Sequence, residues 1–578
     1  MPYEVKLQDA YKGYTLDQDK IVTPEETVKR FREKLKQVDL DILEETVRID
    51  NGRLDIPVYF SVCGRDAEAV IGTKKQMGKG GTPQQAEASA VMELAERFSF
   101  FSFCKDQKNF FVDEFWNVKD QALSLEQIAQ SVHDRGPDVE QALEIFSRLP
   151  LKWTWAYNLT REQPVLVPFN WFYAINEFNG PSAGNCIEEA VSQGICEVVE
   201  RHVSSRVSRE RLGVPGIDLG SAKDHLVRKM LRKYEKAGIR IFASDLSLDT
   251  GIPSVGVLAY DPATFPEKSE IVWTAGTTPN PDKALSRALT EVAQLAGDFN
   301  SSSNYVASGL PKLKSLDEGA FIMEPEEVVT LSGLPDLSSD NIKTEVENCV
   351  SALAHVGMDV NIINVTHPRL GIPAFYTIMP GAHFRERALG TSVAMFSAKL
   401  LAEGVDQTMA IKELQRMDEA VPGKYFVQFY LGYSFLRQSS PSEALPHFTK
   451  ALALDPKDED IPSIYSYLGV CLKEMGRYRE AIEVLHKAEK YDPDRTDIYN
   501  LLGFCHYSLK EHEKAIECFK KVIQIDPASA IDYANIGSNY RDLGEREKAI
   551  RYYRLALELD SNITFARDNL RKLEQRFR

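Results

Sequence analysis

Apolar positions in the first 385 residues follow two periods, which predicts a domain of mixed helices and strands. Short runs rich in β-branched and aromatic residues occur at 56–63, 164–169, 253–260, 270–278 and 372–379. Amphipathic stretches separate them. One of these is residues 24–38, where Thr23 is a suitable N-cap and Pro24 suits the first helical position. We therefore expect an α/β (α+β) domain in this part of the chain.

A different pattern begins near residue 422, where small residues recur at a nearly constant interval. The repeating glycines are Gly432, Gly469, Gly503 and Gly537, at intervals of 37, 34 and 34 residues, and the repeating alanines are Ala444, Ala481, Ala515 and Ala549 at the same intervals. A large residue follows each alanine by four positions: Phe448, Leu485, Phe519 and Tyr553. A period of this length predicts an array of helical repeats.

These residues resemble the tetratricopeptide repeat, in which small residues let two helices approach and a large residue fills the space between neighbours. We expect four repeats, followed by a capping helix in residues 561–578. Such arrays bind an extended peptide or a partner helix and do no chemistry. The polar residues expected on the inner helices either recognise a peptide or only pack one repeat against the next: Tyr465, Asn500, Tyr507, Asn535 and Tyr540.

Two predicted helices of the first domain carry the same acidic pattern. The first has Ser89, Glu93, Glu96 and Arg97, and the second has Glu189, Glu197, Glu200 and Arg201. Positions three and four apart share a helix face, so each helix presents a pair of glutamates with an arginine beside it. Both patterns lie among apolar residues, and buried like charges are costly unless they are paired or bound to metal. Structural ion pairing is the alternative explanation.

A third segment has matching chemistry. Asn280 and Pro281 begin a predicted helix, and Arg287, Glu291 and Gln294 follow along one face. Mg2+ prefers oxygen ligands and is often shared between carboxylates and phosphates, and arginine offers a planar fork to phosphate oxygens. The sequence therefore predicts a nucleoside triphosphate site built from helices.

A Walker phosphate loop is excluded as the way this chain binds a nucleotide. Five residues separate Gly72 from Gly78 where that motif has four, and Gly80 stands where Ser or Thr would coordinate magnesium. Lys79, between two glycines, either approaches a phosphate or occupies a turn.

Taken in order, the motifs resemble the YcaO family over roughly residues 1 to 385. They are the Gly78–Gly80 run, the Ser89 to Arg97 helix, Gly184 and Asn185 leading into the second acidic helix, and the segment around Arg287 and Glu291. The resemblance implies a protein that binds ATP and Mg2+ and phosphorylates the oxygen of a peptide backbone amide. The activated carbon is then attacked by a Cys, Ser or Thr side chain to form an azoline, or by a sulfur donor to form a thioamide.

The resemblance also implies roles for individual residues. The Mg2+ ligands would be Glu93, Glu96, Glu197, Glu200 and Glu291. The residues that position ATP would be Lys12, Ser89, Ser182, Asn185, Glu189, Arg201 and Arg287.

One departure from the family pattern affects the expected reaction. Azoline-forming members often end in a Pro-x-Pro-x-Pro tail, whereas this chain continues into helical repeats. This favours thioamide formation, or an accessory role in the methylthiolation of a ribosomal protein. Two further alternatives are a repeat scaffold with a regulatory ATP-binding domain and a ligase that makes an acyl phosphate.

Composition limits the possible partners and compartment. The chain has 85 acidic and 69 basic residues and a net charge of −16, which argues against nucleic-acid binding. No apolar run is long enough for a membrane span, and the first residues lack a signal-peptide core, so we expect a cytoplasmic protein. The eight cysteines lack metal-binding spacing and are interpreted as small buried hydrophobes, with Cys186 and Cys196 beside the second acidic motif.

These observations predict three parts: an ATP-binding domain at 1–388, a helical connector at 389–421 and the repeats at 422–578. We expect the repeats to recruit a peptide or protein substrate, and to serve a sulfur-delivery partner where sulfur is inserted. We also expect a homodimer.

Overall fold

The computed structural model describes residues 3–300, 305, 310–384, 392–404 and 406–575. It forms two compact units, the first made of Met1–Val139 and Phe146–Val393 and the second of Glu140–Ile145 and Ala394–Arg578. The short stretch 140–145 belongs to α6 (Val139–Ser147). The predicted boundary between residues 388 and 389 lies outside the described residues.

Three sheets form the framework of the first unit. The first has the order β1 (Leu43–Arg48), β2 (Val58–Cys63), β3 (Lys75–Lys79). The second has the order β11 (Val272–Thr277), β10 (Ser254–Tyr260), β9 (Arg240–Asp245), β8 (Gly216–Asp218), β12 (Val328–Thr330). The third has the order β4 (Phe111–Asp113), β5 (Leu151–Asn158), β13 (Asn361–Asn364), β14 (Ala374–Ile378), β7 (Pro181–Ala183), and β6 (Gln163–Pro168) also pairs with β5.

The strand pairs of these sheets are antiparallel except for β8 with β12. The predicted mixed fold is confirmed. Because the strand pairs are mostly antiparallel, the domain is of the α+β class. Each of the five predicted runs contains a strand: β2, β6, β10, β11 and β14.

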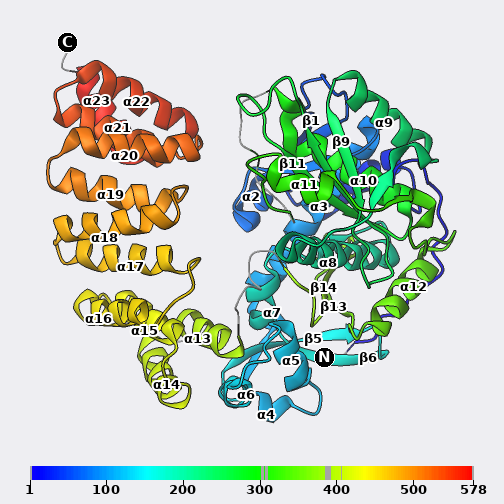
Figure 1. The fold of residues 1–578 in the computed structure, drawn as a ribbon, viewed down its shortest axis with the longest axis horizontal. Helices are drawn as coiled ribbons and strands as arrows, with labels where there is room; N and C mark the ends of the chain where they lie inside the picture. The colour runs from blue at the N-terminus through cyan, green and yellow to red at the C-terminus, as the bar shows by residue number, and fades with distance from the viewer. Residues whose placement is uncertain (1–2, 301–304, 306–309, 385–391, 405, 576–578) are drawn as a thin grey trace. The chain divides into compact units, whose positions relative to one another are not determined.

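The sheets are accompanied by helices of very different lengths. The described helices of this unit, apart from α6, are α1 (Pro24–Val38), α2 (Arg65–Ile71), α3 (Pro83–Lys105), α4 (Phe115–Val118), α5 (Leu125–Ser131), α7 (Phe169–Asn176), α8 (Ile187–Glu210), α9 (His225–Lys236), α10 (Pro281–Ala296), α11 (Ala320–Met323) and α12 (Ile342–His355). The three acidic segments of the sequence are α3, α8 and α10 (Figure 1). Helix α3 packs on β2 and β3, α8 on β7 and β14, and α10 on β10 and β11.

Glycines permit close packing wherever one of these three helices meets its sheet. A Cβ on Gly78 of β3 would lie 2.0 Å from the backbone nitrogen of Ala90 in α3. A Cβ on Gly276 of β11 would lie 2.3 Å from the carbonyl oxygen of Ala284 in α10. Real Cβ atoms cannot approach backbone atoms so closely, so these positions require glycine. The acidic helices are thereby held against rigid sheets.

Residues 315–340 contain Pro325, Gly333 and Pro335 among acidic and serine residues, a composition that indicates a surface insertion. The structure shows this to be wrong in part. Residues 328–330 form β12, the strand parallel to β8, and the following Leu331 is buried in the core beside the second sheet. Only three residues pair, which is too short to give an alternating hydrophobic pattern.

The described residues of the second unit are helical apart from turns. After α13 (Val393–Gly404) and α14 (Gln407–Ala420) come the repeat pairs α15 (Tyr425–Arg437) with α16 (Pro441–Ala453), α17 (Ile461–Glu474) with α18 (Tyr478–Tyr491), α19 (Thr496–Ser508) with α20 (His512–Ile525), and α21 (Ala530–Asp542) with α22 (Arg546–Leu559), followed by α23 (Thr564–Gln575). Figure 1 shows α17 to α22 stacked in chain order.

The repeating glycines and large residues meet as the sequence pattern predicts. A Cβ on Gly503 would lie 2.7 Å from the ring of Phe519, and one on Gly469 would lie 2.6 Å from Leu485. Each glycine thus leaves room for the large side chain of the partner helix in its own repeat, and the buried alanines complete the contact.

The polar residues of the inner helices link neighbouring repeats. Asn500 donates a hydrogen bond to Asp532 at 3.0 Å, and Tyr507 donates one to Asp542 at 3.2 Å. Asn535 donates to Asp532 within its own helix, α21, at 3.3 Å. The contacts between repeats favour repeat packing over peptide recognition for Asn500 and Tyr507. Among the described residues, no helix is both long and apolar enough to cross a membrane.

Candidate functional site

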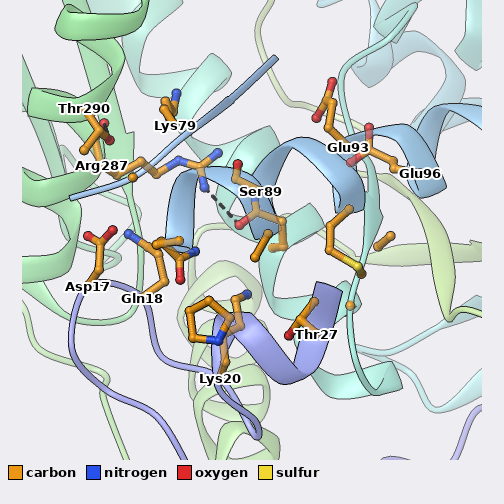
Figure 2. Close-up of a pocket in the computed structure, with 18 of the residues that line it drawn as sticks. Asp17, Gln18, Lys20, Thr27, Lys79, Ser89, Glu93, Glu96, Arg287 and Thr290 are labelled. Atoms are coloured by element: carbon orange, nitrogen blue, oxygen red, sulfur yellow. Dashed lines mark hydrogen bonds between the residues drawn. The ribbon is translucent and has the colours of Figure 1, made fainter. Parts of the chain in front are cut away.

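The three acidic helices, β3 and the segment before α1 line one cavity of about 270 Å3 in the first unit (Figure 2). Its lining includes Asp17, Gln18 and Lys20 from the N-terminal segment and Lys79 from β3. The structure therefore brings together side chains that lie up to 277 residues apart in the sequence, Asp17 and Gln294.

Helix α3 contributes one continuous face. Ser89, Glu93, Glu96 and Arg97 line the cavity, spaced by four, three and one. Thr82 caps the helix through a hydrogen bond from the backbone N–H of Gln85 at 3.2 Å, and Pro83 occupies the first turn. In Figure 2, Glu93 and Glu96 lie side by side at one end of the cavity, and Thr27, Gln18 and Lys20 lie away from them.

Helix α8 contributes a row with a strict spacing of four residues. Glu189, Gln193, Glu197 and Arg201 all line the cavity. From α10 come Arg287, Thr290, Glu291 and Gln294. The predicted faces of all three helices therefore converge, because each follows the period of an α-helix.

In the described structure, basic side chains pair with the carboxylates. Arg97 lies 2.9 Å from Glu93 and 3.5 Å from Glu96, and Glu291 forms an ion pair with Lys79. Arg201 lies 4.0 Å from Glu197.

Glu200 forms the link between two of the helices. Its carboxylate lies 3.4 Å from Arg201 and 3.3 Å from Arg287, and it accepts a hydrogen bond from the backbone N–H of Thr277 at 3.3 Å. Arg287 also donates to Gln193 at 2.9 Å. The two arginines are thus fixed in direction by a carboxylate with a side chain only 2% exposed.

Burial strongly affects the acid–base properties of the glutamates. Burial, together with the charge of Glu93, raises the pKa of Glu96 well above its usual range. Burial also raises the pKa of Glu197, and the arginines Arg201 and Arg97 oppose the shift. The anionic forms are therefore held at a cost that a bound cation would reduce.

The basic side chains respond to the same environment. Burial lowers the pKa of Arg287, but the charges of Glu200 and Glu197 outweigh it and the net shift is upward. Burial and the neighbouring Arg287 lower the pKa of Lys79 to about 7, and the ion pair with Glu291 favours its charged form. Lys79 thus lies in the lining of the cavity. This supports the interpretation that it approaches a phosphate over the interpretation that it only occupies a turn.

The donor set fits Mg2+ with one rearrangement. In the part of the chain that the structure describes, no three His, Cys, Asp or Glu side chains converge closely enough to hold a metal ion. The reason is visible in the ion pairs, because arginine and lysine occupy the carboxylate oxygens that a metal would need. Buried glutamates from three helices would provide hard oxygen ligands, which Mg2+ prefers, if those partners turned to a phosphate chain.

Three residues of the predicted site lie outside the cavity lining. Lys12 pairs with Asp19 at 2.7 Å and with Glu345 at 2.6 Å, and Glu200 lies behind the arginines. Ser182 is fully buried and donates to the carbonyl oxygen of Ala190 at 2.7 Å, so it fastens β7 to α8. Direct contact of these three with ATP or Mg2+ stays a prediction.

Glu189 and Asn185 lie at the N-terminal end of α8 and are joined by hydrogen bonds. The Glu189 carboxylate accepts hydrogen bonds from both nitrogens of Asn185 at 2.9 Å and from the backbone N–H of Ile21 at 2.7 Å. Glu189 therefore holds the N-terminal segment against the helix, a role that its helical position alone does not reveal.

Sequence reasoning missed several lining residues. Gln193 could have been found, since it lies midway between Glu189 and Glu197 on the same face. Asp17, Gln18 and Lys20 carry no such signal, because they belong to a segment without helical or strand period.

The two cysteines near the second acidic motif are not reactive thiols. Burial raises the pKa of Cys186 and of Cys196 to about 12. Both are therefore protonated near neutral pH, and neither is suited to act as a nucleophile.

Comparison with known proteins finds relatives of both parts of the chain. The model of the family described as YcaO cyclodehydratase, ATP- and Mg2+-binding, matches residues 77–383, and tetratricopeptide-repeat models match 469–510, 496–529 and 533–563. The chain is 28% identical over 381 residues to an uncharacterised protein of Methanothermobacter thermautotrophicus, covering 62% of this chain and 94% of that protein.

Another relative is the ribosomal protein S12 methylthiotransferase accessory factor YcaO of Escherichia coli. It is 28% identical over 302 residues, which cover 47% of this chain and 48% of the relative. Among solved structures, a heterocyclase in complex with substrate and cofactor has a TM-score of 0.51 at 22% identity, covering 66% of this chain and 55% of that one. YcaO from Methanopyrus kandleri bound with AMPPCP and Mg2+ has a TM-score of 0.49 at 24% identity, covering 65% and 95%.

A mixed α/β domain with a buried, charge-dense cavity, followed by tetratricopeptide repeats, defines the class as an ATP- and Mg2+-binding protein with a repeat array. The chain belongs to the YcaO family, whose model covers more than half of its length. ATP and Mg2+ are its cofactors, and it is an ATP-dependent enzyme of the cyclodehydratase family.

Proposed function

We propose that this protein activates a peptide backbone amide by ATP-dependent phosphorylation of the amide oxygen, and that the activated carbon then receives sulfur from a sulfide-level donor while its C–O bond breaks and phosphate leaves. The observation that carries the proposal is the convergence of three acidic helices and five basic side chains on one cavity. A triphosphate cannot lie among carboxylates unless cations separate the charges.

The roles of the residues follow from their positions. Glu93, Glu96, Glu197 and Glu291 line the cavity and would hold Mg2+, with Glu200 behind them. Bound ATP supplies the phosphoryl group, and Mg2+ neutralises its charge. Arg287 and Arg201, directed by Glu200, are suited to bind phosphate oxygens.

Part of the cavity lining is uncharged and suits the nucleoside. Pro24, Thr27, Met77, Ala88 and Met92 belong to this lining. Gln85 lines the cavity as well and is buried, with a side-chain oxygen that has no hydrogen-bond partner among the described residues. We expect ATP to bind with its phosphates toward Glu93 and Glu96, where Mg2+ would neutralise their charge.

Sulfur insertion is preferred over heterocyclisation because the Escherichia coli relative is named for the methylthiolation of a protein, which adds sulfur. Cys186 and Cys196 are buried thiols with raised pKa values, so neither is suited to carry that sulfur. Sulfur would therefore come from a separate delivery protein. The accessory function named for the Escherichia coli relative in ribosomal-protein methylthiolation is the second candidate, since it also concerns sulfur modification of a protein.

The repeats would recruit the protein substrate. The inner helix α19 presents Phe504, which is 45% exposed, and the ammonium group of Lys473 lies 5.0 Å from its ring. An exposed aromatic residue beside a cation is a suitable anchor for a peptide. This residue was not among the inner-helix positions selected from the sequence.

We infer further that the protein is cytoplasmic and dimeric. The eight cysteines are all free in the structure, as in a reducing compartment. The homodimer stays a prediction, and sedimentation analysis of the purified chain tests it.

The proposal is tested by replacing glutamates of the site. In Glu96→Gln and Glu200→Gln the cavity loses negative charge without loss of volume, so the fold should persist and ATP hydrolysis should fall by about a hundredfold or more. Glu87→Gln on the same helix α3 is the control, because Glu87 pairs with Arg32 outside the cavity lining.

Retained hydrolysis in both variants would overturn the assignment. The product separates the alternatives, since phosphate transferred to a free carboxylate indicates a ligase. Absence of hydrolysis by the unaltered chain with any candidate peptide indicates a regulatory domain.

A further inference from the structure

The loop after α7 connects directly to the acidic end of the cavity. Arg97 donates a hydrogen bond to the carbonyl oxygen of Phe178 at 3.3 Å, and Arg201 donates one to the side chain of Asn179 at 3.1 Å. The backbone N–H of Gly180 lies 3.4 Å from the carboxylate of Glu197. Three residues that line the cavity therefore hold this loop of four residues, 177–180.

The backbone of the loop is held in an unusual conformation. Glu177 has φ 48° and ψ −112°, a combination that residues with a side chain rarely adopt. Gly180 has φ 101°, and a Cβ there would lie 2.5 Å from the carbonyl oxygen of Thr377. Such conformations persist only where surrounding contacts enforce them, and they are concentrated at functional sites.

The consequence of this backbone path is an exposed aromatic ring. Phe178 is 46% exposed, although its ring lies 5.7 Å from that of Phe101 and 6.5 Å from that of Tyr173. The guanidinium group of Arg97 lies 6.0 Å from the ring centroid. Phe101, Tyr173 and Phe178 thus form an aromatic shelf beside the arginine that pairs with Glu93 and Glu96.

We propose that the aromatic shelf binds the substrate peptide, through an apolar or aromatic side chain within about two residues of the amide that is activated. This inference rests on the proposed function, because it places a peptide next to the phosphate-binding end of the cavity. A residue of extended chain spans about 3.5 Å, and the guanidinium group of Arg97, which lines the cavity, lies 6.0 Å from the Phe178 ring centroid. About two residues therefore separate an amide near Arg97 from a side chain on the shelf. Aromatic contacts add selectivity there.

The test uses short capped peptides and the full chain loaded with Mg2+ and a non-hydrolysable ATP analogue. The probes are N-acetyl-Phe-Gly-Gly-amide and N-acetyl-Ala-Gly-Gly-amide, with binding followed by ligand-detected NMR. The unaltered chain should prefer the phenylalanine probe by about threefold to tenfold. Phe178→Ala should abolish this preference, and Phe178→Leu should retain part of it.

The matched control is Phe111→Ala. Phe111 is 41% exposed on the edge strand β4 and contributes no side chain to the cavity, so its loss should leave the preference unchanged. The affinity of Phe178→Ala for the ATP analogue should stay within about twofold of the original, because the ring does not line the nucleotide cavity.

Three results would overturn the inference. The first two are a missing preference in the unaltered chain and a preserved preference in Phe178→Ala. The third is a loss of affinity for the ATP analogue in Phe178→Ala as large as the loss of affinity for the phenylalanine probe, which would show that the ring only braces Arg97. Dissociation of a dimer by Phe178→Ala with the preference intact would assign the shelf to a second copy of the chain. Any of these with normal ATP hydrolysis leaves the proposed function standing, so the two failures are distinguishable.

Discussion

At the scale of single residues, each glutamate expected to hold Mg2+ has a basic partner before a ligand arrives. Glu93 and Glu96 share Arg97, Glu200 shares Arg201 and Arg287, and Glu291 has Lys79. A metal ion must displace these cations from the oxygens, and the cations then need a new anionic partner. A phosphate chain provides one, so metal and nucleotide should each bind weakly alone and strongly together.

This dependence can be measured by thermal denaturation of the full chain. ATP with a chelator and Mg2+ without nucleotide should each change Tm little, while the two together at about a hundred times the Kd should stabilise the fold by about 2.7 kcal/mol. An equal shift with ATP and chelator would contradict the argument, because it would show that the basic residues alone hold the triphosphate.

Lys79 allows a sharper test of the same idea. Lys79→Met removes the ammonium group and leaves Glu291 buried without that partner, so ATP binding should weaken by at least about tenfold, as expected for the loss of a buried charge–phosphate contact. Lys79→Arg keeps a charge and should recover part of the affinity. Isothermal titration calorimetry with Mg2+ and the ATP analogue measures both, and Lys75→Met on the same strand, whose ammonium lies 5.0 Å from the ring of Phe60, is the control. Unchanged affinity in Lys79→Met would remove this lysine from the site.

At the scale of secondary-structure elements, the helices of the site could be predicted from the sequence and the loops could not. Glu93, Glu197 and Arg287 lie on faces that the 3.6-residue period defines, so their convergence follows once the helices are known. Gln18 and Phe178 lie in segments without a period, and tertiary contacts hold these segments, from Glu189 to the backbone of Ile21 and from Arg97 to Phe178. Ser182 was selected from a motif position, and the structure adds that its hydroxyl group donates a hydrogen bond to the carbonyl oxygen of Ala190 in α8, while its contact with ATP stays a prediction.

The contact of β3 with α3 gives a prediction about an element. Gly78→Ala would place a Cβ 2.0 Å from the backbone of Ala90, so the strand must move away from the helix and take Lys79 with it. We expect a loss of about 1–3 kcal/mol in the free energy of unfolding, with weaker ATP binding. Gly213→Ala is the control, because a Cβ there meets no atom within 4 Å. Equal denaturation midpoints for the two variants would contradict the close contact.

At the scale of the whole molecule, charge separates the two parts of the chain. Residues 422–578 contain 24 acidic and 24 basic residues, so the net charge of −16 belongs entirely to residues 1–421. The neutral repeat array is therefore suited to selective contacts through residues such as Phe504, while the acidic part repels polyanions. The repeats were predictable because their period fixes which residues meet, whereas the exposed anchor depends on which inner-helix side chains the neighbouring repeats leave uncovered.

The cavity and the repeats lie in different parts of the chain, and this separation predicts the effect of removing the repeats. Every residue that lines the described cavity lies before residue 295, so a chain without residues 422–578 should keep its basal ATP hydrolysis within about twofold. Stimulation by a protein substrate should be lost, because the recruiting surface is absent. In the full chain, Phe504→Ala should raise the KM for that substrate with little change in kcat, since truncating an interface aromatic typically costs about 1–3 kcal/mol of binding. Gel filtration of the shortened chain verifies that it stays folded after α14 loses its neighbour α15. Stimulation that survives the deletion would show that the substrate is bound by the first unit alone, and that the repeats serve the sulfur-delivery partner instead.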